Sequence, residues 1–230
     1  MPAVISIANQ KGGAGKTTVT MNLAGGLHEA GYRVLVIDAD PQQSATKWRN
    51  RQEENQLGFD IISMARPGLH KDLPGMNLDY EIILIDCPPG LADASGQGGI
   101  TIGAVLASQF VLVPVQPTFL DYEASQMVLP LLQQVAAFRP DLQALIVVNR
   151  KPTNRSRLAT EAREAAVAFF TSTEVSIRVL QAELSDRTAY KESPGTGQTI
   201  LRYEPGSKGA EEVRQLTMEV LECLRVPARA

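Results

Sequence analysis

A lysine and two threonines follow closely spaced glycines near the start of the chain. The glycines are Gly12, Gly13 and Gly15, and Lys16-Thr17-Thr18 opens a helical pattern. A glycine-rich turn at a helix N-terminus points backbone N–H groups into one small volume, where the helix dipole adds positive partial charge. Phosphate is the natural occupant of such a volume. We therefore predict a nucleotide-binding loop formed by Gly12, Gly13, Ala14, Gly15, Lys16, Thr17 and Thr18.

Two side chains of this loop have distinct predicted roles toward ATP or ADP with Mg²⁺. Lys16 would reach the β- and γ-phosphates, and the Thr17 hydroxyl would ligate Mg²⁺. The apolar run 3–8 before the loop is typical of a buried strand. A strand, a glycine loop and a helix in this order favour a P-loop over an ordinary flexible glycine turn.

Carboxylates follow two further apolar runs that are typical of buried strands. Residues 34–37 precede Asp38 and Asp40, and residues 82–85 precede Asp86. The carboxyl ends of the strands of an open α/β sheet gather ligand-binding groups at one edge. We expect Asp86 to hold the Mg²⁺ shell as a Walker B carboxylate. Helix capping remains an alternative role for Asp38 and Asp40, because a helical pattern follows them.

The loop departs from the usual P-loop at its beginning. Gln10 stands where a glycine is usual, and Lys11 follows it, so the segment reads Lys-Gly-Gly-x-Gly-Lys-Thr. This form resembles the deviant Walker A motif of the ParA/MinD family of ATPases. The resemblance implies that Lys11 reaches across a dimer interface to the nucleotide of the partner subunit. A solvated loop lysine is the alternative interpretation of Lys11.

The segment Asp38-Ala-Asp40-Pro-Gln resembles the family's switch segment. The resemblance implies that Asp40 positions the attacking water and that Asp38 supports the Mg²⁺ shell. The catalytic residues would then be Lys11, Lys16 and Asp40, and the metal-binding residues Thr17, Asp38 and Asp86.

Two later positions resemble base-contacting residues. Asn149 follows the apolar run 145–148 and resembles the adenine-contacting asparagine of related P-loop ATPases. A turn asparagine before Pro152 is the alternative. Pro205 lies in the segment 203–209, which resembles the family's late loop that closes over the base.

Composition limits the class of protein. The 230 residues are 44% hydrophobic and 20% charged, and the net charge of −3 does not indicate a nucleic-acid partner. The two cysteines, Cys87 and Cys223, argue against a disulfide framework or a four-thiolate metal site and suit a cytoplasmic protein. No apolar run reaches the roughly 18 residues of a membrane span. A strand pattern begins at the first residues, so we expect no signal peptide.

Apolar runs alternate with helical patterns along the whole chain. Further strands are expected at 59–64, 110–113, 145–148 and 177–180, and helices at 17–30, 42–56, 100–107, 120–138 with a kink or division at Pro130, 156–170 and 210–224. This alternation predicts an α/β protein with a single doubly wound, mostly parallel sheet and helices on both faces. We expect one P-loop ATPase domain of the deviant Walker A type over residues 1–230.

The resemblance covers almost the whole chain and is greatest to the small ParA proteins of plasmid and cargo partition, of the ParF kind. It implies a homodimer that forms on ATP binding, binds nonspecific DNA and is released when a small centromere-binding or adaptor protein stimulates hydrolysis. Such a protein would be cytoplasmic and nucleoid-associated, with no membrane partner.

Two basic regions are candidates for the DNA contact. Arg150, Lys151, Arg155 and Arg157 lie within a stretch without acids, although part of it could face the nucleotide. The resemblance places DNA-facing residues in a later region, where two acids, Asp186 and Glu192, offset the charge. The predicted DNA-binding residues are Arg187, Lys191, Lys208, Arg214, Arg155 and Arg157.

The residues also bear on three other functions. A MinD-like membrane-associated ATPase needs a basic amphipathic C-terminal helix, whereas the last helix carries four glutamates, Glu211, Glu212, Glu219 and Glu222. An ATPase of the nitrogenase iron-protein type needs two cysteines around a shared cluster, and Cys223 is badly placed for one. A metabolic ATP-dependent ligase remains open, although no second constellation for a substrate is present.

Overall fold

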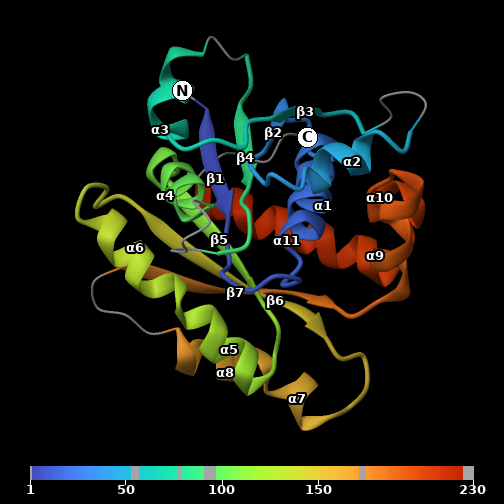
Figure 1. Ribbon diagram of the computed structural model, residues 1–230. Helices are drawn as coiled ribbons and strands as arrows, with labels where there is room; N and C mark the ends of the chain where they lie inside the picture. Colours follow the sequence, from blue (N-terminus) through green and yellow to red (C-terminus); the bar gives the residue numbers. More distant parts are fainter. Residues whose placement is uncertain (1, 53–56, 77–78, 91–96, 171–174, 225–230) are drawn as a thin grey trace.

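The core of the molecule is a single sheet of parallel strands (Figure 1). The computed structural model describes residues 2–52, 57–76, 79–90, 97–170 and 175–224. Within these residues seven strands lie in the order β3-β2-β4-β1-β5-β6-β7, and every described pairing is parallel. The strands are β1 Ala3–Ile7, β2 Val34–Asp38, β3 Asp60–Ser63, β4 Ile82–Asp86, β5 Phe110–Val115, β6 Gln143–Lys151 and β7 Ser176–Ser185.

Helices cover both faces of this sheet, which confirms the predicted doubly wound fold. Neighbouring residues of β1 enter different cores: Ile5 packs with α1 and α11, and Val4 packs with α4 and α6. The helices are α1 Lys16–Glu29, α2 Ser44–Arg49, α3 Leu69–Asp72, η1 Leu73–Gly75, α4 Gln97–Ala107, α5 Phe119–Gln126, α6 Val128–Ala136, α7 Arg157–Thr160, α8 Ala162–Phe169, α9 Thr188–Glu192, η2 Ser193–Thr196, α10 Ile200–Tyr203 and α11 Lys208–Leu224.

Two predicted helices are divided, and one is shorter than expected. The helix expected at 120–138 divides at Met127 instead of Pro130. Pro130 is the third residue of α6, where a missing N–H costs nothing because first-turn N–H groups have no intrahelical acceptor. The helix expected at 156–170 breaks at Glu161 into α7 and α8. Helix α2 ends at Arg49, and residues 53–56 of the predicted helix lie outside the described residues.

Strand β7 is an edge strand, and two glutamates of α11 bind three of its backbone N–H groups. Glu219 accepts hydrogen bonds from the backbone N–H groups of Gln181 and Ala182, at 2.8 to 2.9 Å. Earlier in α11, Glu212 accepts from the backbone N–H of Ser185 at 3.1 Å. Gln181 and Ala182 lie where the register between β6 and β7 shifts, and such an irregularity leaves backbone groups unpaired in the ladder. Glu219 therefore supplies an acceptor at this irregularity.

Candidate nucleotide-binding site

The predicted P-loop connects the end of β1 to the start of α1, as expected. Gly13 and Gly15 have φ angles of 75° and 93°, which L side chains rarely adopt. A Cβ at Gly15 would also lie 2.3 Å from Nδ2 of Asn149. Asn149 donates from this nitrogen to the carbonyl of Ala14 at 2.8 Å. The structure thus brings Asn149 to the P-loop, where its amide supports the loop backbone.

Lys16 is buried at the centre of the loop, with only 7% of its surface exposed. Its ammonium donates to the backbone carbonyls of Asn9 and Lys11 at 3.2 and 3.3 Å. Burial lowers the pKa of Lys16, although the negative charge of Asp86 works against that shift. Carbonyl oxygens hold the ammonium in the place where phosphate oxygens would compete for it.

The carboxylates at the ends of β2 and β4 are neighbours. Asp38 and Asp86 lie opposite each other in the strand register, and both are fully buried. Asp86 accepts hydrogen bonds from the hydroxyls of Thr17 at 2.7 Å and Thr20 at 3.3 Å. Burial raises the pKa of Asp86 to about 7, and the charge of Asp38 adds to this shift. The predicted metal-binding residues are therefore assembled at one point.

Asp38 also holds helix α2. Its Oδ2 accepts from both the backbone N–H and the hydroxyl of Thr46, each at 2.8 Å. Asp38 thus accepts from a first-turn N–H of α2 although the N-cap residue of that helix is Gln43, and burial raises the pKa of Asp38 while these hydrogen bonds act in the opposite direction. Asp40 accepts from the backbone N–H of Gln42 at 2.8 Å and reaches the cavity beside the P-loop.

This cavity measures about 390 Å³ and opens between the P-loop, α2 and Pro194. Its lining residues are Gly12, Gly13, Gly15, Lys16, Thr17, Thr18, Asp40, Ser44, Lys47, Trp48, Arg51, Pro89, Arg150 and Pro194. A narrower hollow beside Gly15 and Asn149 is bounded by the segment 184–191. A larger cavity of about 690 Å³ lies at the amino ends of the strands, beside Arg33 and Tyr80, and contains none of the predicted site residues.

Lys11 does not line the cavity next to its own P-loop. Its ammonium forms an ion pair with Asp121, a residue at the start of α5 for which no role is predicted from the sequence. The spacing Thr118-x-x-Asp121 is typical of a helix start, and the Thr118 hydroxyl does accept from the Asp121 N–H at 3.2 Å. Because this local pattern already accounts for an aspartate at this position, the contact of Asp121 with Lys11 could not be predicted from the sequence.

Pro205 is not brought to the P-loop. It lies on the exposed turn between α10 and α11, where its carbonyl accepts from Arg214 at 3.0 Å. The residues that line the hollow beside Asn149 include Asp186, Tyr190 and Lys191 instead.

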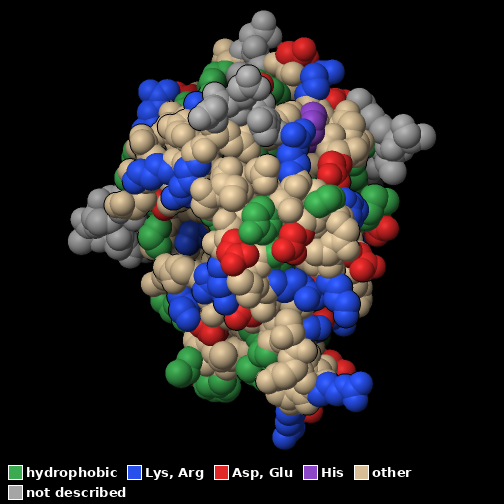
Figure 2. Space-filling view, turned by 90° about the vertical axis from the view of Figure 1, so that its right-hand side faces the viewer, with side chains coloured by type: hydrophobic (Ala, Val, Ile, Leu, Met, Phe, Trp, Pro, Cys, Tyr) green, Lys and Arg blue, Asp and Glu red, His purple; other side chains and the backbone are tan. Residues whose placement is uncertain are grey.

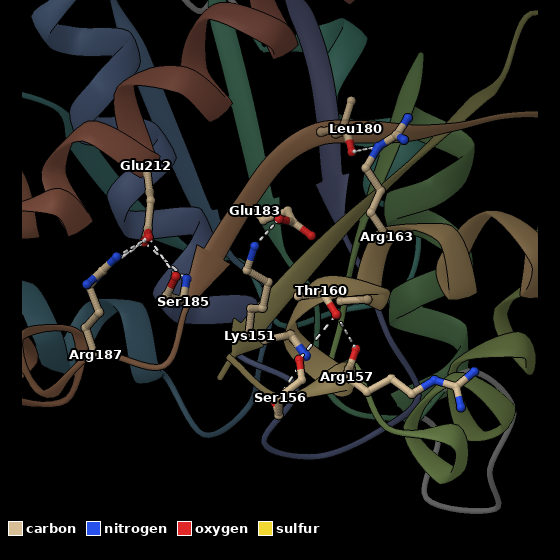
Figure 3. A network of polar contacts seen from close by, with 12 residues as sticks. Lys151, Ser156, Arg157, Thr160, Arg163, Leu180, Glu183, Ser185, Arg187 and Glu212 are labelled. Carbon is tan, nitrogen blue, oxygen red and sulfur yellow. Dashed lines mark hydrogen bonds and ion pairs between the residues drawn. The ribbon is translucent and has the colours of Figure 1, made fainter. Parts of the chain in front are cut away.

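Four of the six predicted DNA-binding residues form ion pairs. Arg187 pairs with Glu212, Lys191 with Asp186, Arg214 with Glu29, and Arg157 with Glu161. Figure 2 shows basic and acidic side chains interleaved on the face turned toward the viewer. Figure 3 separates Arg187, beside α11, from Arg157 on α7, so these two arginines belong to different surface regions. Arg155 and Lys208 have no ion-pair partner among the described residues.

Two further side chains near the site are buried. Burial raises the pKa of the Cys87 thiol well above the usual range, so this cysteine stays protonated. Trp48 is 3% exposed and packs against the body of the protein. Within the described part of the chain, no helix has the length and apolarity needed to cross a bilayer.

Comparisons with known proteins agree with this geometry. A family model described as the CobQ/CobB/MinD/ParA nucleotide binding domain matches residues 5–200. The chromosome-partitioning ATPase Soj of Thermus thermophilus is 30% identical, over 94% of this chain and 94% of its own length. The maintenance of carboxysome distribution protein A of Halothiobacillus neapolitanus is 29% identical, over 94% of this chain and 95% of its own length.

A solved structure shows the same fold. The septum site-determining protein MinD of Pyrococcus horikoshii, solved with Mg-ADP, superimposes with a TM-score of 0.76 over 97% of this chain and 98% of its own, at 24% identity. The match of the family model extends from β1 through the P-loop and both aspartate-bearing strands to α10. The chain therefore belongs to the CobQ/CobB/MinD/ParA family of nucleotide-binding domains.

Proposed function

We propose that this protein is an ATPase of the ParA type, which hydrolyses ATP with Mg²⁺ and positions a cargo by nucleotide-switched binding to nonspecific DNA. The observation that carries this proposal is the pair of lysines in one loop. Lys16 faces the cavity, whereas Lys11 is directed away from it toward Asp121. A loop lysine that does not face its own cavity would be available to a second subunit once its ion pair with Asp121 opens. This favours a cycle in which ATP joins two copies of the chain.

The residues present fit a bound Mg²⁺. Mg²⁺ takes oxygen ligands and keeps several waters, so one or two protein oxygens suffice beside the nucleotide phosphates. Thr17 and Asp86 supply such oxygens, with Asp38 adjacent. Among the described residues, no group of three or more His, Cys, Asp or Glu side chains could hold a metal ion. When bound, Mg²⁺ neutralises charge that develops on the phosphates.

The chain's own groups divide the work of phosphoryl transfer to water. Lys16 is placed to attract phosphate oxygens, because within the described residues its ammonium donates to backbone carbonyls and to no carboxylate. Asp40 is partly fixed by the N–H of Gln42 and faces the cavity, where it can accept a hydrogen bond from an attacking water. Positioning and charge neutralisation supply nearly all of the catalysis in such reactions.

DNA binding requires more positive charge than one subunit displays. Most of the predicted contact residues are engaged by acids of the same chain. Surface ion pairs are weak and can exchange a carboxylate for a phosphate, but few contacts give weak binding at physiological salt. Closing a dimer would double the number of contacts on one surface, and log affinity scales with that number. ATP would thereby switch DNA binding without a change of fold.

Mobility shifts of a random duplex with ATP, ADP and no nucleotide test this function. We expect binding with ATP, little with ADP, no sequence preference and a steep loss with added salt. Lys16→Ala should bind neither nucleotide, because the point charge toward the phosphates is lost, and it should not bind DNA under any condition. Equal DNA binding with ATP and ADP would contradict the proposed switch.

The partner that stimulates hydrolysis would be a small centromere-binding or adaptor protein, and the working location the nucleoid. Similarity to Soj supports a DNA cargo, and similarity to the carboxysome distribution protein supports a cargo of another kind. The neighbouring gene product, added to an ATPase assay with DNA, should accelerate turnover if it is that partner.

A further inference from the structure

The cavity beside the P-loop has a second wall that the nucleotide-binding motifs do not explain. Helix α2 and the turn after it present Ser44, Lys47, Trp48 and Arg51 to the cavity. These positions recur every three or four residues, which is the spacing of one helix face. The face begins four residues after Asp40, so it continues the wall that carries the water-positioning carboxylate.

The lining of this cavity is strongly basic. Lys16, Lys47, Arg51 and Arg150 face it, and Asp40 is the acid among its lining residues. Elsewhere in the described chain several basic side chains form ion pairs with acids, for example Arg139 with Asp141. No described acid lies within ion-pair distance of Lys47, Arg51 or Arg150. A cavity with this excess of cations is suited to a ligand with several negative charges.

Two of these cations come from neighbouring positions of one wall. Lys47 lies on α2 and Arg51 in the turn after it, so two like charges face the same cavity without a described carboxylate between them. By contrast, Arg157 has Glu161 four residues later and forms an ion pair with it. An anion bound between Lys47 and Arg51 would turn their repulsion into a shared attraction.

Backbone strain also lies around this wall. Gln43 and Arg150 both have a φ of 54° and are the described non-glycine residues with positive φ. Gln43 immediately precedes α2, and Arg150 lines the cavity. Such conformations cost free energy and persist where the surrounding structure enforces them, commonly at ligand sites. Here the conformation of Gln43 sets the start of α2, and that of Arg150, near the end of β6, turns this residue toward the cavity.

Helix α2 is fixed by contacts on both sides. Asp38 holds Thr46, as described above. At the other end, the Trp48 indole N–H donates to the carbonyl of Gln198 at 3.1 Å, and Arg51 donates to the carbonyl of Pro194 at 2.8 Å. Arg51 is thus partly engaged, whereas Lys47 has its whole ammonium free for a ligand, because no described residue binds it.

We propose that Lys47 is a phosphate-binding residue that engages the terminal phosphate of a nucleoside triphosphate bound to the P-loop of the same chain, with Arg51 adding its charge. The inference rests on the proposed ATPase function and deepens it. The terminal phosphate must lie near Asp40, because the water that Asp40 positions attacks that group. Lys47 lies on the same wall as Asp40 and supplies a mobile point charge of the kind that phosphates attract.

Fluorescence titrations with the N-methylanthraniloyl derivatives of AMPPNP and ADP, both with Mg²⁺, test this role. Lys47→Gln should weaken the triphosphate analogue by about tenfold and change ADP affinity by less than about twofold, as expected for one lost charge-assisted hydrogen bond. Lys47→Arg should retain most of the triphosphate preference. Lys71→Gln, which removes an exposed lysine on α3 outside the cavity, controls for the change in net charge.

The outcomes separate this inference from the proposed function. If wild type binds neither nucleotide, the ATPase assignment itself fails. If wild type binds both and Lys47→Gln keeps the triphosphate preference, or weakens both nucleotides equally, the role of Lys47 is wrong while the ATPase assignment stands. An effect seen only at concentrations where light scattering detects dimers would place Lys47 on the partner's nucleotide and overturn the same-chain assignment.

Discussion

Lys11 and Asp121 form an ion pair that links the P-loop to helix α5. The Asp121 carboxylate is almost buried, at 8% exposure, whereas Lys11 is 40% exposed. Burial alone would raise the pKa of Asp121, but hydrogen bonds from Lys11 and Thr118 outweigh it and the net shift is downward. Asp121 is therefore a charged acceptor that keeps the Lys11 ammonium within its own subunit.

Releasing this contact should favour the dimer. Asp121→Asn should strengthen ATP-dependent dimerisation by a few-fold, because Lys11 no longer leaves a carboxylate in order to reach a second subunit. The partly exposed pair is worth on the order of 1 kcal/mol.

Lys11→Ala should bind nucleotide normally, but it should neither form dimers nor hydrolyse ATP. Light scattering with AMPPNP measures dimerisation in both variants, and phosphate release from ATP measures turnover. Normal dimers and turnover in Lys11→Ala would show that Lys11 has no role in trans.

Asp40→Ala should separate binding from hydrolysis. Nucleotide and Mg²⁺ contacts made by the P-loop remain, whereas the water loses its orienting carboxylate. We expect turnover to fall by roughly a hundredfold or more, the usual range for such a group. The variant should then accumulate as an ATP-bound dimer, which size-exclusion chromatography detects. A monomeric variant in ATP would be inconsistent with the role of Asp40 as a switch residue.

Asp86 gives a pH dependence of stability in the nucleotide-free protein. Its pKa is raised to about 7 in the folded state from 3.8, so the folded state binds more protons between these values. Stability contributed by this group is therefore present below about pH 4, decreases as pH rises through 7 and is constant above it.

Asp86→Asn should remove this slope and stabilise the nucleotide-free protein at pH 8 by on the order of 2 kcal/mol, since no buried charge remains. The same variant should lose Mg²⁺-dependent hydrolysis. Urea unfolding at pH 5 and pH 8 measures the difference. An unchanged slope in the variant would mean that another group dominates the titration.

Arg187 tests the DNA surface. Arg187→Ala should weaken binding to all sequences alike and reduce the slope of log affinity against log salt by about 1. Glu212 would still accept from the backbone N–H and hydroxyl of Ser185, so the local structure should persist. Arg33→Ala, at the amino ends of the strands, is the matched control and should leave DNA binding unchanged. Equal effects of the two substitutions would argue against a localised DNA surface.

The sequence predicted best what depends on neighbours along the chain. The P-loop, the strand before Asp86 and the parallel sheet follow from local glycine spacing and apolar runs. Contacts between distant segments could not be predicted, because periodicity does not specify which side chain meets which. The pairing of Lys11 with Asp121 and the gathering of Lys47, Arg51 and Arg150 around one cavity depend on such contacts. The break expected at Pro130 is absent, because the free-energy cost of a proline depends on its exact position within a helix and Pro130 lies in a first turn.

Helix α11 gives the fold an order of completion. Its glutamates accept from three backbone N–H groups of β7 and its apolar side chains cover one face of the sheet, yet α11 follows β7 in the chain and must be synthesised after it. Until α11 docks, a folding intermediate would expose that apolar face and leave these three N–H groups without their acceptors, and exposed apolar surface of this kind makes intermediates prone to aggregate. The sheet is therefore completed only after synthesis has passed Leu224, at the end of α11.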